Sequence, residues 1–444
     1  MAFLPEWNRP YKSMSGRQNL RVVRLILQCA CACALVSGCD RTVRETRAPL
    51  PQSGYVWQRD WTPVVVESVS EAQRRMDGIV VLGAEIVWAG KKPEAIKSSL
   101  NWQTLKSATK PVSVALRIAP YAGPFAADDA PARFIATTAK SLMEEAQANG
   151  VKLRAFQIDF DCAQKNLAGY RRWLQVLRPL IQPAPLIVTT LPAWLDEPEF
   201  SQLIRDVDGY VLQVHSVPAA SGNGRAVLCD AQLARQSVAK AARLRVPFAV
   251  ALPTYRCLAG YDESGKLLSV AMDSIQPVWP RGTRVLEFAT DADEVAALVG
   301  DWRKSRPELL RELFWYRVPV TTDERNWRWP TLAAVMAGRV PAHKVDVTSQ
   351  GDNPVDLSIV NVGEADEQRD PTVTVSWSDG STIIASDALP GWTVVVEKER
   401  AIFKPEAGLR LRLSPGATRS IGWLRYDRAP NFRAQVEELG ESHR

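Results

Sequence analysis

Two aspartates separated by one residue are the strongest chemical signal in the sequence. They lie in the run Gln157-Ile158-Asp159-Phe160-Asp161. Side chains alternate between the two faces of a β-strand, so the glutamine and both aspartates share one face, and the isoleucine and phenylalanine share the other. We expect the apolar pair to pack under helices. Unpaired carboxylates on the inner face would be costly, so that face requires a proton, a cation or hydrogen-bond partners.

Five other runs of strand length end in polar side chains of comparable chemistry. These side chains are Glu85, Arg117, Gln213 with His215, Tyr255, and Arg317. His215 stands out because the chain has only three histidines. Acids, an imidazole, a phenol and guanidinium groups at neighbouring strand ends could support general acid–base chemistry or ligand binding.

The same residues also admit a purely structural interpretation. Arg117 and Arg317 could neutralise Glu85 and Asp159 in buried ion pairs that serve packing alone. His215 is as compatible with a satisfied polar side chain as with a base. The choice between these interpretations depends on whether the groups meet at one site.

Metal and nucleophile chemistry have weaker support. Asp159, Asp161 and His215 could bind a metal, but no HxH or HExxH spacing accompanies them, and we expect no metal and no cofactor. No GxSxG-like turn is present for a serine nucleophile. Cys162 follows the acidic pair, which raises the pKa of a thiol and disfavours the reactive thiolate.

The chain contains 15 tryptophans, and several lie in or just after the predicted strands. Aromatic rings at such positions can stack on the apolar faces of sugar rings. We expect Trp57 and Trp315 to contact a substrate in this way. The alternative is that these rings pack in the core.

Short apolar runs alternate with helical patterns from residue 55 to about 340. Predicted strands cover 55–58, 78–87, 111–118, 155–161, 186–192, 209–215, 247–255 and 313–319, and predicted helices cover 131–149, 163–181, 230–244, 291–304 and 330–338. Eight strands alternating with helices predict a (β/α)8 TIM-type barrel, in which polar residues at the carboxyl ends of the strands form the site. An open doubly wound sheet is the alternative, but no Gly-rich turn follows the first strand.

The remaining segments complete a predicted domain plan. Residues 256–290 do not fit the repeat and are expected to form an inserted hairpin. After residue 341, alternating short strands with Gly, Pro, Asn and Asp between them predict an all-β sandwich. The plan is a signal peptide over 1–38, a tether over 39–53, the barrel over 54–341, the sandwich over 342–428 and a tail over 429–444.

The first forty residues resemble a bacterial lipoprotein signal. Three arginines precede a twelve-residue apolar run, 25–36, which is too short to span a bilayer as a helix. The run ends in Val36-Ser37-Gly38-Cys39, and the resemblance implies cleavage before Cys39 and attachment of lipid to it. The protein would then be exported and anchored to the bacterial envelope, facing the periplasm or the exterior. An ordinary secretory signal is the alternative, and Met14 is a possible start.

Charge and cysteine counts change once this leader is set aside. The chain has 55 basic and 49 acidic residues, and 50 and 48 remain after residue 38, so no excess of positive charge suited to nucleic acid is left. Four of the seven cysteines lie at or before Cys39. Cys229 and Cys257 follow neighbouring barrel strands, and we predict a disulfide between them with Cys162 reduced. Three free thiols are the alternative.

Five separated motifs give the chain a family resemblance. YVWQRDWT at 55, QIDFDC at 157, YRRWL at 170, TTLPAWL at 189 and GYVLQVHS at 209 resemble a family of uncharacterised bacterial proteins defined by domain of unknown function 3142. The resemblance runs from about residue 55 to 423. That family has no established activity to carry over.

A more distant resemblance concerns the paired aspartates. They are similar to the family-18 chitinase signature Asp-x-Asp-x-Glu, with Asp159 and Asp161 at the aspartate positions. The glutamate that acts as the acid would fall at residue 163, which is Ala163. The resemblance therefore implies a sugar-binding barrel whose acid is Asp161 or Glu85, or a barrel that binds sugar without cleaving it.

Three functional hypotheses follow. The first is an envelope-anchored, glycoside-hydrolase-like barrel acting on a polysaccharide or cell-wall glycan, in which Asp159, Asp161 and Glu85 are catalytic. The second is a non-catalytic glycan-binding or envelope-assembly scaffold, and the third is a metal-dependent hydrolase or deacetylase. The expected substrate-binding residues are Gln157, Gln213, His215, Tyr255, Trp57, Trp315, Arg117 and Arg317.

Overall fold

The computed structural model describes residues 43–90, 92–217, 227–272, 278–409 and 411–442. Residues 45–444 form one compact unit, separate from the first 44. The predicted signal peptide over 1–38 and Cys39 lie outside the described residues. Within the described ranges, no helix is both long enough and apolar enough to cross a membrane.

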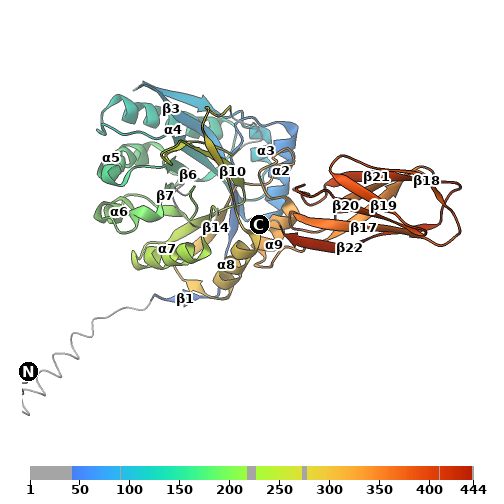
Figure 1. Cartoon of the computed structure of the whole chain (residues 1–444). Helices are drawn as coiled ribbons and strands as arrows, with labels where there is room; N and C mark the ends of the chain where they lie inside the picture. The colour runs from blue at the N-terminus through green and yellow to red at the C-terminus, as the bar shows by residue number, and fades with distance from the viewer. Residues whose placement is uncertain (1–42, 91, 218–226, 273–277, 410, 443–444) are drawn as a thin grey trace, which may run out of the picture. The chain divides into compact units, whose positions relative to one another are not determined.

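Eight parallel strands close into a barrel, as the sequence predicts (Figure 1). The first strand, β2, pairs with both β14 and β3, and this double pairing closes the cylinder. The strands are β2 (Gln52–Val56), β3 (Gly78–Ala89), β5 (Val112–Ile118), β6 (Leu153–Phe160), β7 (Leu186–Thr190), β8 (Gly209–Gln213), β9 (Phe248–Pro253) and β14 (Leu310–Tyr316).

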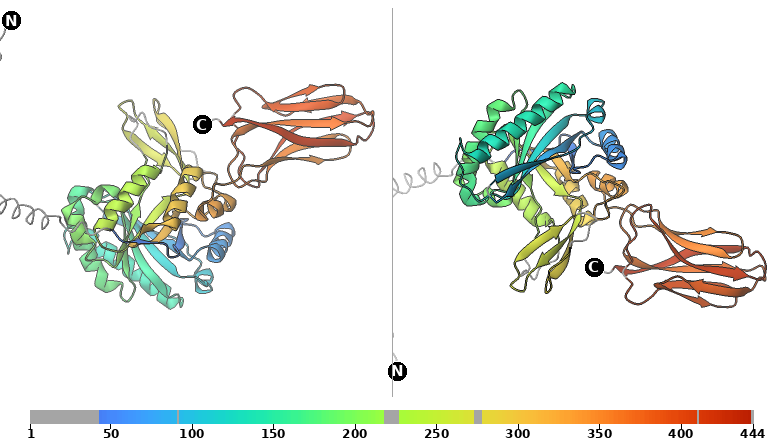
Figure 2. Two further views of the ribbon diagram at one scale, coloured as in Figure 1. Left: turned by 90° about the horizontal axis from the view of Figure 1, so that it is seen from below. Right: turned by 90° about the horizontal axis from the view of Figure 1, so that it is seen from above.

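Helices surround the strands (Figure 2). They are α2 (Pro63–Arg75), α3 (Trp102–Lys106), α4 (Ala130–Ala148), α5 (Leu167–Leu177), α6 (Pro198–Leu203), α7 (Ala231–Arg243), α8 (Ala292–Lys304) and α9 (Trp329–Met336). Asp129, Asp230 and Asp291 cap the amino ends of α4, α7 and α8 by accepting backbone N–H bonds. Helices α3 and α6 were not predicted because they are too short to show a helical repeat. Helix α2 was missed because its first turn is a β-branched valine run.

Strand alternation in β6 sorts the side chains as predicted. Ile158 and Phe160 lie in the main core, between the barrel wall and the helices. The ring of Phe160 lies edge-on to Tyr170 of α5, with 5.1 Å between the ring centroids. Gln157 and Asp159 therefore face the inside of the barrel.

The insertion after β9 is larger than the predicted hairpin. It is a three-stranded antiparallel sheet in which β10 (Arg256–Tyr261) lies between β11 (Leu267–Ala271) and β12 (Arg284–Ala289) (Figure 2, yellow). The central strand was missed because its Arg-Cys-Leu-Ala-Gly-Tyr sequence has no clear strand signature. Gly260 is required there, since an added Cβ would meet the ring of Trp279 at 2.3 Å.

Two further pairs of strands lie outside this pattern. The antiparallel strand β4 (Lys92–Lys97) extends the barrel sheet beside β3. Two short strands, β1 (Glu45–Thr46) and β13 (Arg306–Pro307), pair with each other.

The C-terminal part is a sandwich of two four-stranded antiparallel sheets, ordered β15-β16-β21-β18 and β19-β20-β17-β22. Trp377 and Tyr426 meet edge-on in its core at 5.2 Å. The strands are β15 (Val345–Gln350), β16 (Val355–Asn361), β17 (Arg369–Trp377), β18 (Ile383–Ala388), β19 (Trp392–Val396), β20 (Arg400–Pro405), β21 (Thr418–Tyr426) and β22 (Phe432–Ser442). The last strand lies in the segment for which a tail was predicted.

A carboxylate inside the amino-terminal end of the barrel is neutralised by one arginine. Glu312 of β14 is buried and accepts two hydrogen bonds from Arg154 of β6, at 2.9 and 2.7 Å. The hydroxyl of Ser53 donates a third bond at 2.5 Å. The pair links two strands that lie on opposite sides of the barrel.

Replacing Arg154 with Ala should destabilise the protein, because the buried Glu312 would lose its cationic partner. Arg154 is partly exposed to water, so we expect a loss of about 1–3 kcal/mol. Urea denaturation measures it. The control is Arg311→Ala on the same strand, whose side chain is 55% exposed and lies 4.0 Å from Glu308. Equal losses for the two variants would contradict this interpretation.

Candidate active site

The carboxyl ends of three adjacent strands bring a carboxylate, a guanidinium and a second carboxylate into line. Glu85 of β3 pairs in register with Arg117 of β5, which pairs in register with Asp159 of β6. Arg117 Nε lies 3.5 Å from Glu85 Oε1, and its Nη1 lies 3.9 Å from Asp159 Oδ2. Burial alone would lower the pKa of Arg117, but the negative charges of Asp159 and Glu85 outweigh it and raise the pKa. Arg117 is therefore a permanent positive charge between two acids.

Asp159 is held by neutral donors from the next two strands. The hydroxyl of Thr189 on β7 donates to Asp159 Oδ1 at 2.7 Å, and the amide of Gln213 on β8 donates to the same oxygen at 3.1 Å. With Arg117 beside its other oxygen, this carboxylate has a fixed orientation inside the barrel mouth.

Asp161 differs from Asp159 in its exposure and in its lack of partners. It lies just past the end of β6, is exposed, and makes no hydrogen bond or ion pair with any described residue. Desolvation by the surrounding protein and the charge of Asp159 raise its pKa from an ordinary 3.8 to about 6, against the opposing effect of Arg117. A carboxyl that is accessible, unpaired and partly protonated near neutral pH can donate a proton to a ligand.

Glu85 is already paired on both sides. In addition to Arg117, the exposed Arg59, which follows β2, donates to Glu85 Oε2. The charge of Glu85 is thus neutralised by protein groups. The structure therefore favours Asp161 over Glu85 as a proton donor.

Aromatic rings form the opposite wall of the mouth. Tyr316 of β14 lies between Trp57 and His215. Its ring centroid is 5.3 Å from that of Trp57 and 5.9 Å from that of His215, which stacks on it. Tyr255 meets both Tyr316 and His215 edge-on, at 5.6 and 6.1 Å. Trp57, His215 and Tyr255 thus meet at the mouth, as their positions at strand ends predict.

His215 is neutral in this wall. Burial lowers its pKa to about 4, despite a contact of 3.4 Å between Nδ1 and the carbonyl of Ala251. An imidazole with that pKa does not carry a charge at neutral pH. His215 therefore contributes a flat polar surface and no positive charge.

Gln157 lies one layer deeper than the aspartates. It is buried, and its Oε1 accepts a hydrogen bond from the hydroxyl of Tyr55 at 2.9 Å. Burial and the nearby Asp159 raise the pKa of Tyr55, so its hydroxyl stays protonated. The pair forms part of the floor beneath the carboxylates.

Two predicted substrate-binding residues do not face the mouth. Trp315 is fully buried in the core outside the barrel, where its indole N–H donates to Gln52 Oε1 at 3.0 Å. The prediction was wrong because Phe314 and Tyr316 take the inward positions of β14, which sends Trp315 outward.

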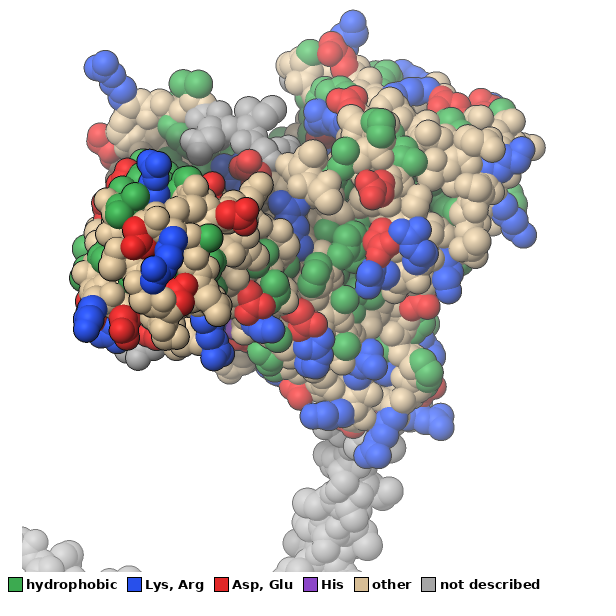
Figure 3. All heavy atoms as spheres, turned by 90° about the vertical axis from the view of Figure 1, so that its right-hand side faces the viewer, with side chains coloured by type: hydrophobic (Ala, Val, Ile, Leu, Met, Phe, Trp, Pro, Cys, Tyr) green, Lys and Arg blue, Asp and Glu red, His purple; other side chains and the backbone are tan. Residues whose placement is uncertain are grey.

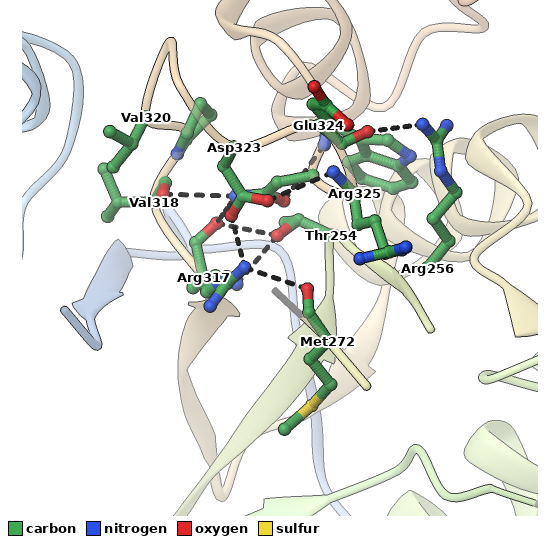
Figure 4. A network of polar contacts seen from close by, with 12 residues as sticks. Thr254, Arg256, Met272, Arg317, Val318, Val320, Asp323, Glu324 and Arg325 are labelled. Atoms are coloured by element: carbon green, nitrogen blue, oxygen red, sulfur yellow. Dashed lines mark hydrogen bonds and ion pairs between the residues drawn. The ribbon is translucent and has the colours of Figure 1, made fainter. Parts of the chain in front are cut away.

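Arg317 is likewise a structural residue. It is buried and forms an ion pair with Asp323, while its Nη2 donates to the carbonyl of Met272 at 3.2 Å (Figure 4). The hydroxyl of Thr254 bonds to the backbone of Arg317 in the same network. Arg317 therefore does not neutralise Glu85, and Arg59 and Arg117 do so instead.

The predicted disulfide is also wrong. Cys162, Cys229 and Cys257 are all free and buried. Cys229 packs in the main core under the helices, whereas Cys257 packs in a separate cluster with Tyr255 and Tyr261 of the insertion. Adjacent strands in a barrel therefore did not bring the two thiols together, because each faces a different apolar cluster.

Three residues of the mouth were missed from the sequence. Arg59 and Thr189 lie within quoted motifs, but neither residue type suggested a role. Tyr316 is hidden in the continuous aromatic run Phe314-Trp315-Tyr316, which shows no alternation. Among the described residues, no group of three or more His, Cys, Asp or Glu side chains is placed to hold a metal ion.

Replacing Asp161 with Asn should change stability in a pH-dependent way. Since the folded protein holds the proton on Asp161 more tightly than the unfolded chain, this group lowers stability as pH rises from about 4 to about 6. The variant removes that cost. We expect its Tm to exceed that of the wild type by about 1–2 °C at pH 8 and to match it at pH 4.

The matched comparison is Asp159→Asn, which weakens the contacts with Arg117, Thr189 and Gln213. We expect the free energy of unfolding of this variant to be about 1–2 kcal/mol lower than that of the wild type at pH 7. Differential scanning calorimetry across pH 4–8 distinguishes the two residues. A lower Tm for Asp161→Asn at pH 8 would mean that Asp161 stabilises the mouth.

Comparison with solved structures finds similarity to chitinase-type barrels at low identity. The spore cortex-lytic enzyme of Bacillus cereus shares 11% identity at a TM-score of 0.44, covering 66% of this chain and 74% of that one. A family GH18 chitinase from Chromobacterium violaceum shares 12% at 0.38, covering 88% and 91%. A family 18 N-acetylglucosaminidase from Paenibacillus barengoltzii shares 13% at 0.42, covering 65% and 100%.

Sequence comparisons give one family. No curated protein matches the chain. Residues 109–321, which include the paired aspartates, match the model of a family described as a domain of unknown function, DUF3142, and the predicted resemblance is confirmed for that segment.

Proposed function

We propose that the barrel hydrolyses glycosidic bonds in a polysaccharide or cell-wall glycan, with Asp161 as the general acid. The observation that carries the proposal is the contrast between two carboxyls two residues apart. Asp159 is fixed by Thr189, Gln213 and Arg117, whereas Asp161 is unpaired, accessible and has a pKa of about 6. Carboxyls in different environments are what glycoside hydrolysis requires of its acid and its charge stabiliser.

In this mechanism, Asp161 donates its proton to the glycosidic oxygen while the bond from that oxygen to the anomeric carbon breaks. The leaving sugar departs as an alcohol. The negative charge of Asp159 stabilises the positive charge that develops on the remaining sugar ring. A water molecule then adds its hydroxyl to the anomeric carbon, and its other proton restores Asp161.

The other mouth residues would bind and orient the sugar. Trp57 and Tyr316 offer aromatic faces, and the neutral His215 and the hydroxyl of Tyr255 offer polar edges. Glu85 would keep Arg117 in position through their 3.5 Å contact. On the described residues of the face shown in Figure 3, Lys/Arg and Asp/Glu side chains are interspersed.

A glycan-binding protein without hydrolytic activity is the second candidate. Two observations favour it. Ala163 stands where the family-18 signature has its acid, and Arg117 lies between the carboxylates of Glu85 and Asp159. The contact from Arg117 to Asp159 is long, at 3.9 Å, so a ligand could displace it.

Hydrolysis assays separate the two candidates. The wild type should release reducing ends from one or more members of a panel of chitin, xylan, β-glucan and peptidoglycan. Asp161→Asn should reduce kcat/KM at least about 100-fold, because it cannot donate the proton. The wild-type rate should fall as pH rises through about 6, where Asp161 loses its proton.

The control for this assay is Asp301→Asn on the outer helix α8, whose side chain is 54% exposed and pairs with Arg235. It should retain full activity. Equal rates for the wild type and Asp161→Asn would reject the acid, and glycan binding without hydrolysis would establish the second candidate.

We also propose that the protein is an exported lipoprotein anchored through Cys39. The support is the arginine-rich start, the apolar run over 25–36 and the Gly38-Cys39 junction. The charged, Pro-containing residues that follow would act as a tether between the membrane and the barrel.

Mass spectrometry of the mature protein tests the anchor. We expect its first residue to be Cys39 carrying acyl chains, and globomycin should block the cleavage. An intact peptide spanning Ala34–Cys39 in the mature protein would refute the lipoprotein assignment.

A further inference from the structure

A cavity of about 620 Å3 lies beside the barrel where the chain passes into the sandwich. Its walls come from the start of the insertion, the first turn of α8, the loop at 325–327 and the sandwich segment 365–369. We call it the junction cavity. Tyr255 lines it and also contacts His215 and Tyr316, so the cavity adjoins the aromatic wall of the mouth.

The sandwich side of the junction cavity is firmly held. Glu364 accepts two hydrogen bonds from Arg339, at 2.5 and 2.7 Å, and its carbonyl accepts from the hydroxyl of Thr331 on α9. Glu367 is buried, and hydrogen bonds from Arg369 and His343 outweigh the effect of burial and lower its pKa. These walls are therefore preformed, as binding sites usually are.

The walls carry charges of both signs in nearly equal number. Four arginines face five carboxylates. Arg412 donates to Glu287 at 2.9 Å, and Arg256 lies 3.3 Å from Asp366 while its other nitrogen bonds to the carbonyl of Glu324 (Figure 4). An ion of either sign would meet repulsion from half of the walls. A neutral ligand that both donates and accepts hydrogen bonds matches them better.

Two carboxylates in the cavity have acceptor capacity that no described residue uses. Asp366 Oδ1 is buried and has no hydrogen-bond partner. The side chain of Asp293, in the first turn of α8, has neither a hydrogen bond nor an ion pair with the described residues. A buried acceptor oxygen without a donor is unfavourable, and a ligand hydroxyl in the cavity would supply the missing donor.

We propose that the junction cavity binds a neutral, hydroxyl-rich ligand of the sugar class, with Asp293 and Asp366 accepting hydrogen bonds from its hydroxyls. Arginines on the same walls donate to its oxygens, and Trp327 and Tyr255 supply apolar surface. The site is separate from the carboxyls of the mouth and does not require the barrel to cleave a bond. In a protein that acts on a glycan, it would hold a second stretch of the polymer.

Isothermal titration of the full chain with chitotetraose and cellotetraose tests the proposal. The Asp161→Asn background prevents turnover during the titration. We expect a binding event that Asp293→Asn weakens about tenfold to a hundredfold, because a neutral amide replaces a charged acceptor. Asp366→Asn should weaken the same event. Asp301→Asn, on the same helix, is the matched control and should have no effect.

The outcomes are distinguishable from failure of the proposed hydrolysis. The side chain of Asp293 has no partner among the described residues and loses only its weak attraction to the amino end of α8, so its variant should fold with a nearly unchanged Tm even if Asp366→Asn does not. Loss of binding in Asp293→Asn supports the junction site whether or not the wild type hydrolyses glycans. Binding that is insensitive to Asp293→Asn, absence of binding of both sugars, or binding of inorganic phosphate alone would overturn the proposal.

Discussion

The negative charge of Asp159 inside the barrel is the constraint on which the rest of the site depends. A carboxylate at that position needs donors on every side, and the parallel register supplies them from neighbouring strands. Arg117 comes from one side, and Thr189 and Gln213 come from the other. Because Arg117 also needs a counter-charge, Glu85 and then Arg59 extend the same chain of interactions to the surface.

Asp161 gains its chemistry from this arrangement. Arg117, Thr189 and Gln213 donate to or lie beside Asp159, whereas Asp161 has no hydrogen-bond or ion-pair partner among the described residues. The charge of Asp159 then acts on it only as a repulsion, and together with desolvation it raises the pKa to about 6. The proton on Asp161 is thus linked to the charge on its neighbour, and neither carboxyl has its properties in isolation.

Sequence patterns predict the parts of this site that depend on the alternation of side chains along a strand. The alternation in β6 assigns Phe160 to the core and Asp159 to the interior, and both assignments are confirmed. The eight strands and their order follow from the same periodicity. The mouth could be anticipated because parallel strands end at one edge.

Prediction fails where the sequence does not show which face of a strand a side chain occupies or where its partner lies. The run Leu313 to Tyr316 is apolar at every position, so nothing in it shows that Trp315 points outward. The partner of Arg317 is Asp323, only six residues away in a loop. The position of Arg317 at a strand end predicts instead a partner on another strand of the barrel. The sandwich segment at the junction cavity is brought to α9 by Glu364, and no local signal in the sequence foretells that contact.

The absence of a glutamate at residue 163 has a physical consequence for any proton transfer in the mouth. Ala163 is exposed at the start of a short 3-10 turn, so the chain has already left the barrel at that point. In the proposed mechanism the proton therefore comes from Asp161, which lies just past the end of β6. Its pKa of about 6 allows this carboxyl to hold a proton at pH values of about 4 to 6, where an ordinary aspartate has already lost its proton. In the proposed mechanism, the charge held in place on Asp159 raises the pKa of Asp161 and so allows Asp161 to serve as the acid although residue 163 is Ala163.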